Sequence, residues 1–134
     1  MPDAISEPMG CYCLGFLWNR GDEPGDAFDP ITNRRIEFKA TSNFDSDLSS
    51  FGPETVFDDL ILLRYDLSND LLYIYDLQIN SDQFGEFPAN SYETIQDQKD
   101  QRRRPHVSLI KLFVNNYNLQ PNIVFDIRRC RIME

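Results

Sequence analysis

The pattern of hydrophobic and polar positions predicts strands through most of the chain and one helix late. The apolar run at residues 11–18 has the length of a strand and ends in the turn-rich residues 19–25. Residues 36–41 alternate apolar and polar side chains with period two, as does a strand with one face on a core and one in water. We therefore expect two strands in the first third of the chain.

A hairpin is the clearest expected element. Residues 60–65 and 71–79 are rich in strand-forming side chains, and the Asp, Ser and Asn residues of segment 66–70 form a turn between them. Both faces of the second run are substantially apolar, which predicts a central position in a sheet. Residues 123–127 return to period two, and the apolar parity shifts at Arg128 and Arg129, so a bulge or the strand end is expected there.

The best helical signal lies at residues 107–117, where apolar residues recur at three- and four-residue spacing. These elements predict an α+β fold, with a mostly antiparallel sheet of about five strands and one main C-terminal helix packed on one face. The expected core joins the helix to the strands through Leu109, Leu112, Phe113, Leu62, Ile74, Phe38 and Phe125.

The chain of 134 residues fits one domain, 1–134, with residues 1–10 as a loose N-terminal segment. Residues 80–106 are expected to be a loop or a solvated helix, because a capping-box pattern at Asn90 and Glu93 precedes a polar stretch. No signal peptide or membrane-spanning stretch is visible, and an odd number of cysteines fits reduced thiols. The expected compartment is the cytoplasm or the nucleus, without membrane contact.

Charge is distributed unevenly along the chain. The net charge is −9, yet residues 1–100 hold 20 acidic and 6 basic side chains, whereas residues 101–134 hold 2 and 7. An acidic body repels nucleic acid at long range and attracts basic surfaces. The candidate acidic binding surface consists of Asp22, Glu23, Asp26, Asp29, Asp45, Asp47, Asp58 and Asp59.

The basic residues near the C-terminus form the candidate basic patch, which consists of Arg102, Arg103, Arg104, Arg128, Arg129 and Arg131. Arginines close to aromatic residues are typical of RNA or single-strand binding. The same arginines could instead neutralise the acidic body or dock an acidic partner. Nucleic-acid binding requires the two clusters to form one surface.

His106 is the single histidine and lies at the expected helix start. It could serve as a general base in a small carboxylate-dependent enzyme, provided that two or more carboxylates converge with it in one pocket. No serine or cysteine partner is identifiable in the sequence, and a lone histidine at a helix start is usually a surface or capping residue.

Cys11, Cys13, Cys130 and His106 match the composition of a Cys₃His zinc site, but the spacing of the first two is not that of a zinc knuckle. Buried thiols are the favoured interpretation. The acidic loops do not follow a calcium-loop pattern, and no nucleotide-binding, zinc-protease or hydrolase-elbow motif is present. We therefore expect no metal and no cofactor.

The leading interpretation is a non-catalytic acidic binding protein, such as an adaptor, an inhibitor or an assembly subunit. Its expected partner is a protein with a basic surface, approached by electrostatic steering. One version of this hypothesis is a mimic of nucleic-acid charge. Nucleic acid as a direct partner and a carboxylate-dependent enzyme with His106 are the alternatives.

Overall fold

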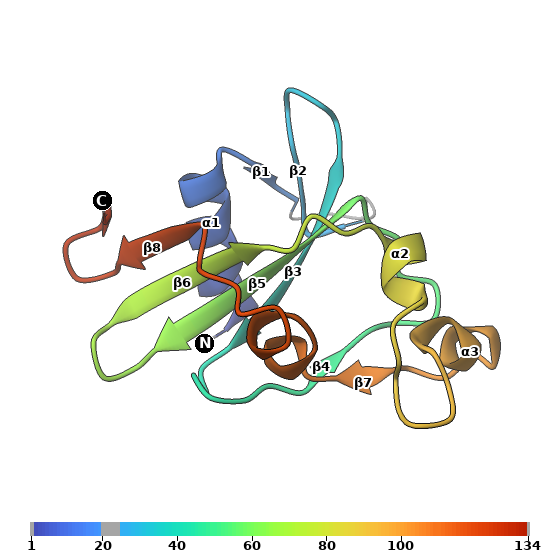
Figure 1. Ribbon diagram of the computed structural model, residues 1–134. Coiled ribbons are helices and arrows are strands. Elements are labelled where there is room, and N and C mark those ends of the chain that lie inside the picture. The colour runs from blue at the N-terminus through green and yellow to red at the C-terminus, as the bar shows by residue number, and fades with distance from the viewer. Residues whose placement is uncertain (1, 20–24, 134) are drawn as a thin grey trace.

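A computed structural model describes residues 2–19 and 25–133 (Figure 1). The helices are α1 (Asp3–Leu14), α2 (Ser81–Gly85), α3 (Ile95–Asp100) and the π-helix η1 (Ile110–Asn115). The strands are β1 (Leu17–Trp18), β2 (Ala27–Phe28), β3 (Arg35–Thr41), β4 (Ser49–Ser50), β5 (Asp59–Asp66), β6 (Leu71–Asp76), β7 (His106–Val107), β8 (Ile123–Asp126) and β9 (Arg131–Ile132). None of these helices is long and apolar enough to cross a membrane.

The sheet has more strands than expected, and one pair of them is parallel. Seven strands lie in the order β1-β2-β3-β5-β6-β8-β9, and β4 pairs with β7 in a separate two-stranded sheet. The pair β3 and β5 is parallel, while the other neighbours are antiparallel. The prediction of about five mostly antiparallel strands under one main C-terminal helix is therefore wrong, although helices and strands do occur together as in an α+β protein.

The longest helix is N-terminal, where the sequence pattern predicted a loose segment and then a strand. Helix α1 is continuous through Pro8 and ends at Gly15, whose φ of 74° is left-handed. Tertiary packing explains its stability, because Gly10 and Cys11 are buried against the sheet. The strand expected at 11–18 shrinks to the two residues of β1.

The predicted C-terminal helix is only the six-residue π-helix η1. Its first turn is held by Asp47, whose side chain accepts backbone hydrogen bonds of 2.9 Å from both Leu109 and Ile110. A π-helix has i→i+5 hydrogen bonds and is usually a single turn, so the apolar stripe extends over a shorter element than its pattern indicated.

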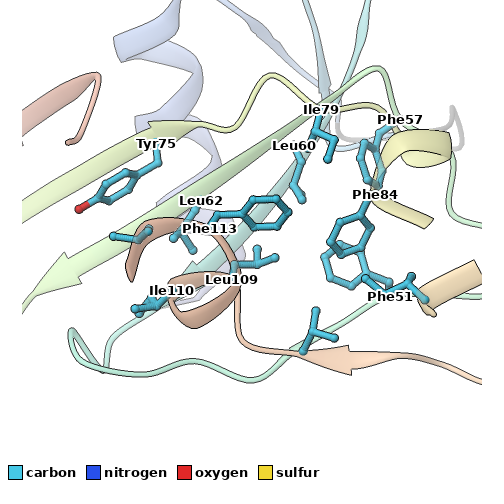
Figure 2. Packing of buried hydrophobic residues seen from close by; sticks show 13 residues of the cluster. Phe51, Phe57, Leu60, Leu62, Tyr75, Ile79, Phe84, Leu109, Ile110 and Phe113 are labelled. Atoms are coloured by element: carbon cyan, nitrogen blue, oxygen red, sulfur yellow. The ribbon is translucent and has the colours of Figure 1, made fainter. Parts of the chain in front are cut away.

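The sheet separates two hydrophobic clusters, because β5 sends Leu60 and Leu62 to one face and Ile61 and Leu63 to the other. Figure 2 shows the first cluster, in which η1 lies over the sheet beside the phenylalanines that precede and follow β5. The second cluster lies under α1. The expected core is thus divided: Leu62, Leu109 and Phe113 belong to the first cluster, and Phe38, Ile74 and Phe125 to the second.

Candidate active site

A carboxylate is fixed at the margin of the sheet where β2 stops pairing with β3. Within β3, only Arg35 and Ile36 pair with β2. One residue before β2, the Asp26 backbone N–H donates to the carbonyl of Ile36 at 2.9 Å, and the Asp26 side chain accepts the N–H of Phe38 at 2.8 Å. Asp26 therefore takes the place of a neighbouring strand along this part of β3.

Strand β3 adds a second carboxylate and an ammonium. Glu37 and Lys39 are two residues apart, so both leave the same face of the strand, the face opposite to Ile36 and Phe38. The Lys39 Nζ lies 3.4 Å from Glu37 Oε2 and 4.7 Å from the centre of the Phe51 ring. Both side chains are mostly buried, with 23% of Lys39 and 12% of Glu37 exposed.

Helix α1 brings the third carboxylate, Glu7. The indole N–H of Trp18 donates to Glu7 Oε1 at 3.1 Å, which fixes its orientation. The helix approaches β3 closely at Gly10, where an added Cβ would lie 2.9 Å from the Phe38 ring. Gly10 and Glu7 are three residues apart and share one helix face, so this close approach carries Glu7 towards the strand.

Burial and the charges of nearby acids raise the pKa of all three carboxylates. Burial, followed by the charges of neighbouring acids, raises the pKa of Glu7 to about 7 and that of Glu37 to about 7. Burial also raises the pKa of Asp26, which forms a side-chain hydrogen bond with Glu37. Lys39 lowers the pKa of all three, yet its single positive charge does not offset them. The cluster is therefore short of positive charge.

These side chains line an open cleft of about 530 Å³, to which Asp47, Ser50 and Arg104 also contribute. Within residues 2–19 and 25–133, no group of three or more His, Cys, Asp or Glu side chains is arranged to hold a metal ion. Mg²⁺, however, typically takes one or two carboxylates and fills its remaining positions with water and substrate phosphate. Asp26 and Glu37 supply that number of carboxylates.

The residues predicted as one acidic surface have separate roles. Asp22 and Glu23 lie outside the described residues, and Asp26 belongs to the cleft. Asp29 forms a local turn by accepting the N–H of Ile31, and Asp45 is exposed in a loop.

The other three predicted acids are engaged by neighbouring groups. Asp47 accepts hydrogen bonds from the start of η1, as described above. Asp58 pairs with Arg35 at 3.4 Å, and the buried Asp59 pairs with Arg34 at 2.7 Å. Of the predicted acidic surface, Asp26 and Asp47 are the members that line the cleft.

The two arginine clusters lie far apart in Figure 1, one before β7 and one between β8 and β9 at the other end of the sheet. Several of the arginines are paired with acids. These pairs are Arg102 with Glu54, Arg103 with Glu93, Arg128 with Asp70 and Arg129 with Asp126, whereas Arg131 is exposed on β9. The structure therefore does not bring the predicted basic patch together as one surface.

His106 is exposed on β7 beside a hollow that it shares with Ser108 and Lys111. The described residues lining that hollow include no carboxylate. The convergence required of an enzyme based on His106 is therefore not found. Cys11 is buried, Cys13 is half-buried and Cys130 is exposed.

Sequence reasoning missed Glu7, Glu37 and Lys39. Residues 36–41 were correctly predicted as a strand, but Glu37 and Lys39 were assigned to its solvent face. The available signal was a pair of opposite charges, Glu-Phe-Lys, on one face of an otherwise apolar strand. Glu7 had no comparable signal, because its helix was not foreseen.

Comparison with known proteins gives two matches. The profile of the family described as "Bsp6I restriction endonuclease" matches residues 1–116. The Type II restriction enzyme Bsp6I of Bacillus sp. (strain RFL6) is 41% identical over 133 residues, which cover 99% of this chain and 76% of that protein. No solved structure matches the chain.

These matches contradict the functional class expected from composition and charge. An endonuclease family overturns the prediction of a non-catalytic adaptor, inhibitor or assembly subunit, and with it the expectation that the chain is not an enzyme. It also overturns the preference for a basic protein over nucleic acid as the partner. Net charge misled because it averages over the whole surface, whereas a buried cluster acts locally.

Proposed function

Because the chain belongs to the Bsp6I restriction endonuclease family, we propose that it cleaves double-stranded DNA by hydrolysing a phosphodiester bond in the cleft around Glu37. The observation that carries this proposal is the convergence of Glu7, Asp26, Glu37 and Lys39 from three elements of the fold into one cleft. The carboxylates can bind a divalent cation, and the neighbouring ammonium can bind a phosphate. Together these groups are suited to phosphoryl transfer.

The donor set fits a divalent cation such as Mg²⁺ held by Asp26 and Glu37. Burial raises the pKa of both carboxylates, and a bound cation would supply positive charge that favours their ionised forms. When bound, the cation neutralises charge on the phosphate and lowers the pKa of coordinated water. The remaining roles fall to side chains of this chain.

Hydrolysis joins a water oxygen to phosphorus and breaks one ester P–O bond, and a proton finally reaches the leaving oxygen. The Lys39 Nζ lies 3.4 Å from Glu37 Oε2, so it can donate a hydrogen bond to a phosphate oxygen that is bound beside Glu37. Glu7 is the candidate acceptor of the proton from the attacking water. Its pKa of about 7 suits a general base at neutral pH.

DNA replaces a basic protein as the proposed partner. A place inside the cell fits an enzyme that acts on DNA. The nuclear alternative has no support, because the matched relative comes from a Bacillus species.

The test is cleavage of supercoiled plasmid DNA by the purified chain with and without Mg²⁺. We expect discrete fragments with Mg²⁺ and intact plasmid in excess EDTA. The variant Glu37→Gln should lower the rate by at least about a hundredfold, the scale of losing one preorganised charged group. The matched control is Glu86→Gln, which removes the same charge from the exposed C-cap of α2 and should cleave like the unaltered chain.

Two results would overturn the proposal. Intact plasmid after incubation of the folded, unaltered chain with Mg²⁺ would exclude the activity. Equal rates for Glu37→Gln and Glu86→Gln would place the chemistry elsewhere in the molecule.

A further inference from the structure

Arg104 lines the same cleft, although it is far from the three carboxylates in the sequence. It immediately precedes Pro105 and β7, and Phe51 donates its N–H to the Pro105 carbonyl at 3.1 Å. This contact and the β4–β7 pairing hold the base of the side chain. The Arg104 Nε then donates to Ser50 Oγ at 3.2 Å, and Ser50 itself lines the cleft.

Backbone space near β4 accommodates the guanidinium. A Cβ added to Gly52 would lie 3.3 Å from Arg104 Nη1 and 2.9 Å from Thr55 Oγ1. The absence of a side chain at Gly52 therefore leaves room for the guanidinium beside the backbone.

Arg104 differs from the two arginines before it in its ion pairing. Arg102 lies 3.1 Å from Glu54 and Arg103 lies 2.9 Å from Glu93, so each has a carboxylate partner. Among the described residues, no carboxylate lies within ion-pair distance of Arg104. Its exposed guanidinium is thus an uncompensated positive charge beside a cleft rich in acids.

The cleft continues past Glu37 into a second hollow. Glu37 and Arg104 line both, and the second hollow extends along Gly52 to Val56 and reaches Arg35. A polyanion seated over Glu37 and following this groove would pass Arg104 directly. Of the two arginines described in the second hollow, Arg35 is already engaged by Asp58, whereas Arg104 has no ion-pair partner among the described residues.

We propose that Arg104 binds a backbone phosphate of the DNA adjacent to the one that is cut, and so positions the strand in the cleft. This inference rests on the proposed function. A guanidinium offers parallel N–H donors that match two phosphate oxygens, which fixes orientation as well as supplying charge. Arg104 is a binding residue in this scheme and takes no part in proton transfer.

The experiment compares Arg104→Gln with Arg102→Gln, an arginine two residues away whose side chain is 80% exposed and pairs with Glu54. Both variants lose one positive charge from the same segment. Binding is measured by fluorescence anisotropy, in the Glu37→Gln background, to a duplex that carries a cleavage position mapped on the plasmid. Cleavage of the plasmid is measured in parallel with Glu37 intact.

We expect Arg104→Gln to weaken duplex binding about tenfold more than Arg102→Gln. We also expect it to lower the slope of log affinity against log salt by about one, the signature of one lost phosphate contact. Arg104→Lys should restore the slope but only part of the affinity, because it keeps the charge and loses the paired donors. Unchanged melting temperatures would show that the folds are intact.

The two proposals fail differently. If the unaltered chain does not cut plasmid, the proposed function fails and this inference falls with it. If the unaltered chain cuts and Arg104→Gln matches Arg102→Gln in affinity and salt slope, only the role of Arg104 is excluded. An equal loss of affinity in Arg104→Lys and Arg104→Gln, without a change in slope, would likewise exclude a phosphate contact.

Discussion

The backbone N–H of Phe38 donates a hydrogen bond of 2.8 Å to the carboxylate of Asp26, while the ring of Phe38 is buried under helix α1. One residue therefore joins the hydrophobic core to the cleft. Because Gly10 packs against that ring, we expect a shift of α1 to move Asp26 through Phe38 and Glu7 through the helix.

Gly10→Ala tests this coupling. Alanine raises helix propensity by about 1 kcal/mol, but its methyl would lie 2.9 Å from the packed Phe38 ring, and overpacking costs about 1–3 kcal/mol. We expect a net loss of about 1 kcal/mol in the free energy of unfolding, measured by urea denaturation, and a lower cleavage rate. A stabilised variant with full activity would contradict the close packing.

The companion variant is Phe38→Leu, alone and combined with Gly10→Ala. The smaller side chain leaves room for the added methyl, so the double variant should lose less stability than the two single changes added together. Additive losses would show that Gly10 and Phe38 do not constrain each other.

Removal of the Glu37 charge should stabilise the protein at the expense of activity. The pKa of Glu37 is about 7 in the folded protein, whereas its ordinary value is 4.5. The folded state therefore binds the proton more tightly than the unfolded chain does. The stability from protonated Glu37 is fully present below the lower value and is lost as the pH rises through about 7. Glu37→Gln lacks this loss.

We therefore expect the unfolding free energy of Glu37→Gln to exceed that of the unaltered chain by about 1–3 kcal/mol at pH 8 without metal. The excess should shrink towards pH 5. Thermal melts across that range provide the measurement, with Glu86→Gln as control. An excess that is constant with pH would rule out the titration of Glu37 as its cause.

Cation affinity should rise with pH, because Glu37 must release its proton to bind metal. With a pKa of about 7, it is largely protonated at pH 6 and largely ionised at pH 8. The Mg²⁺ concentration for half-maximal stabilisation in a thermal-shift titration should fall about tenfold between these values. The dependence should weaken in Glu37→Gln, and an unaltered midpoint across the range in the unaltered chain would exclude Glu37 as a ligand.

Substitutions of Asp47 and Asp45 should affect stability differently, although both residues were predicted to belong to one acidic surface. Asp47 accepts from the N–H groups of Leu109 and Ile110 and from the hydroxyls of Ser108 and Ser49. Asp47→Ala should lower the unfolding free energy by about 1–3 kcal/mol, as loss of a helix cap and of buried partners does. Asp45→Ala, at an exposed loop position, should change it by less than about 0.5 kcal/mol in the same denaturation experiment.

Local patterns predicted the centre of the fold. The hairpin became β5 and β6, residues 36–41 became most of β3, and residues 123–127 became β8, because period-two alternation directly reflects a half-buried strand. Helix α1 was not predictable in this way. Its apolar run resembles a strand, and its stability comes from packing at Gly10 on a strand about 25 residues later in the chain.

The site was harder to predict than the fold. Its acids come from α1, from the residue before β2 and from β3, and only the three-dimensional arrangement unites Glu7, Asp26 and Glu37. With 22 acidic residues in the chain, no spacing rule singles out these three. Their burial distinguishes them, and burial at Glu7 depends on contacts that a sequence does not display.

The margin of β3 has a consequence for solubility. In the described part of the chain, β3 pairs with β5 from Ile36 to Thr41 but with β2 only at Arg35 and Ile36. A partly unpaired strand is a template for another chain, and charged side chains are the usual protection against such association. Asp26 covers part of this margin, and Glu37 and Lys39 place charges along it. Variants that neutralise both would therefore lose catalysis and become prone to self-association, so inactive mutants of this cleft should be checked for oligomers.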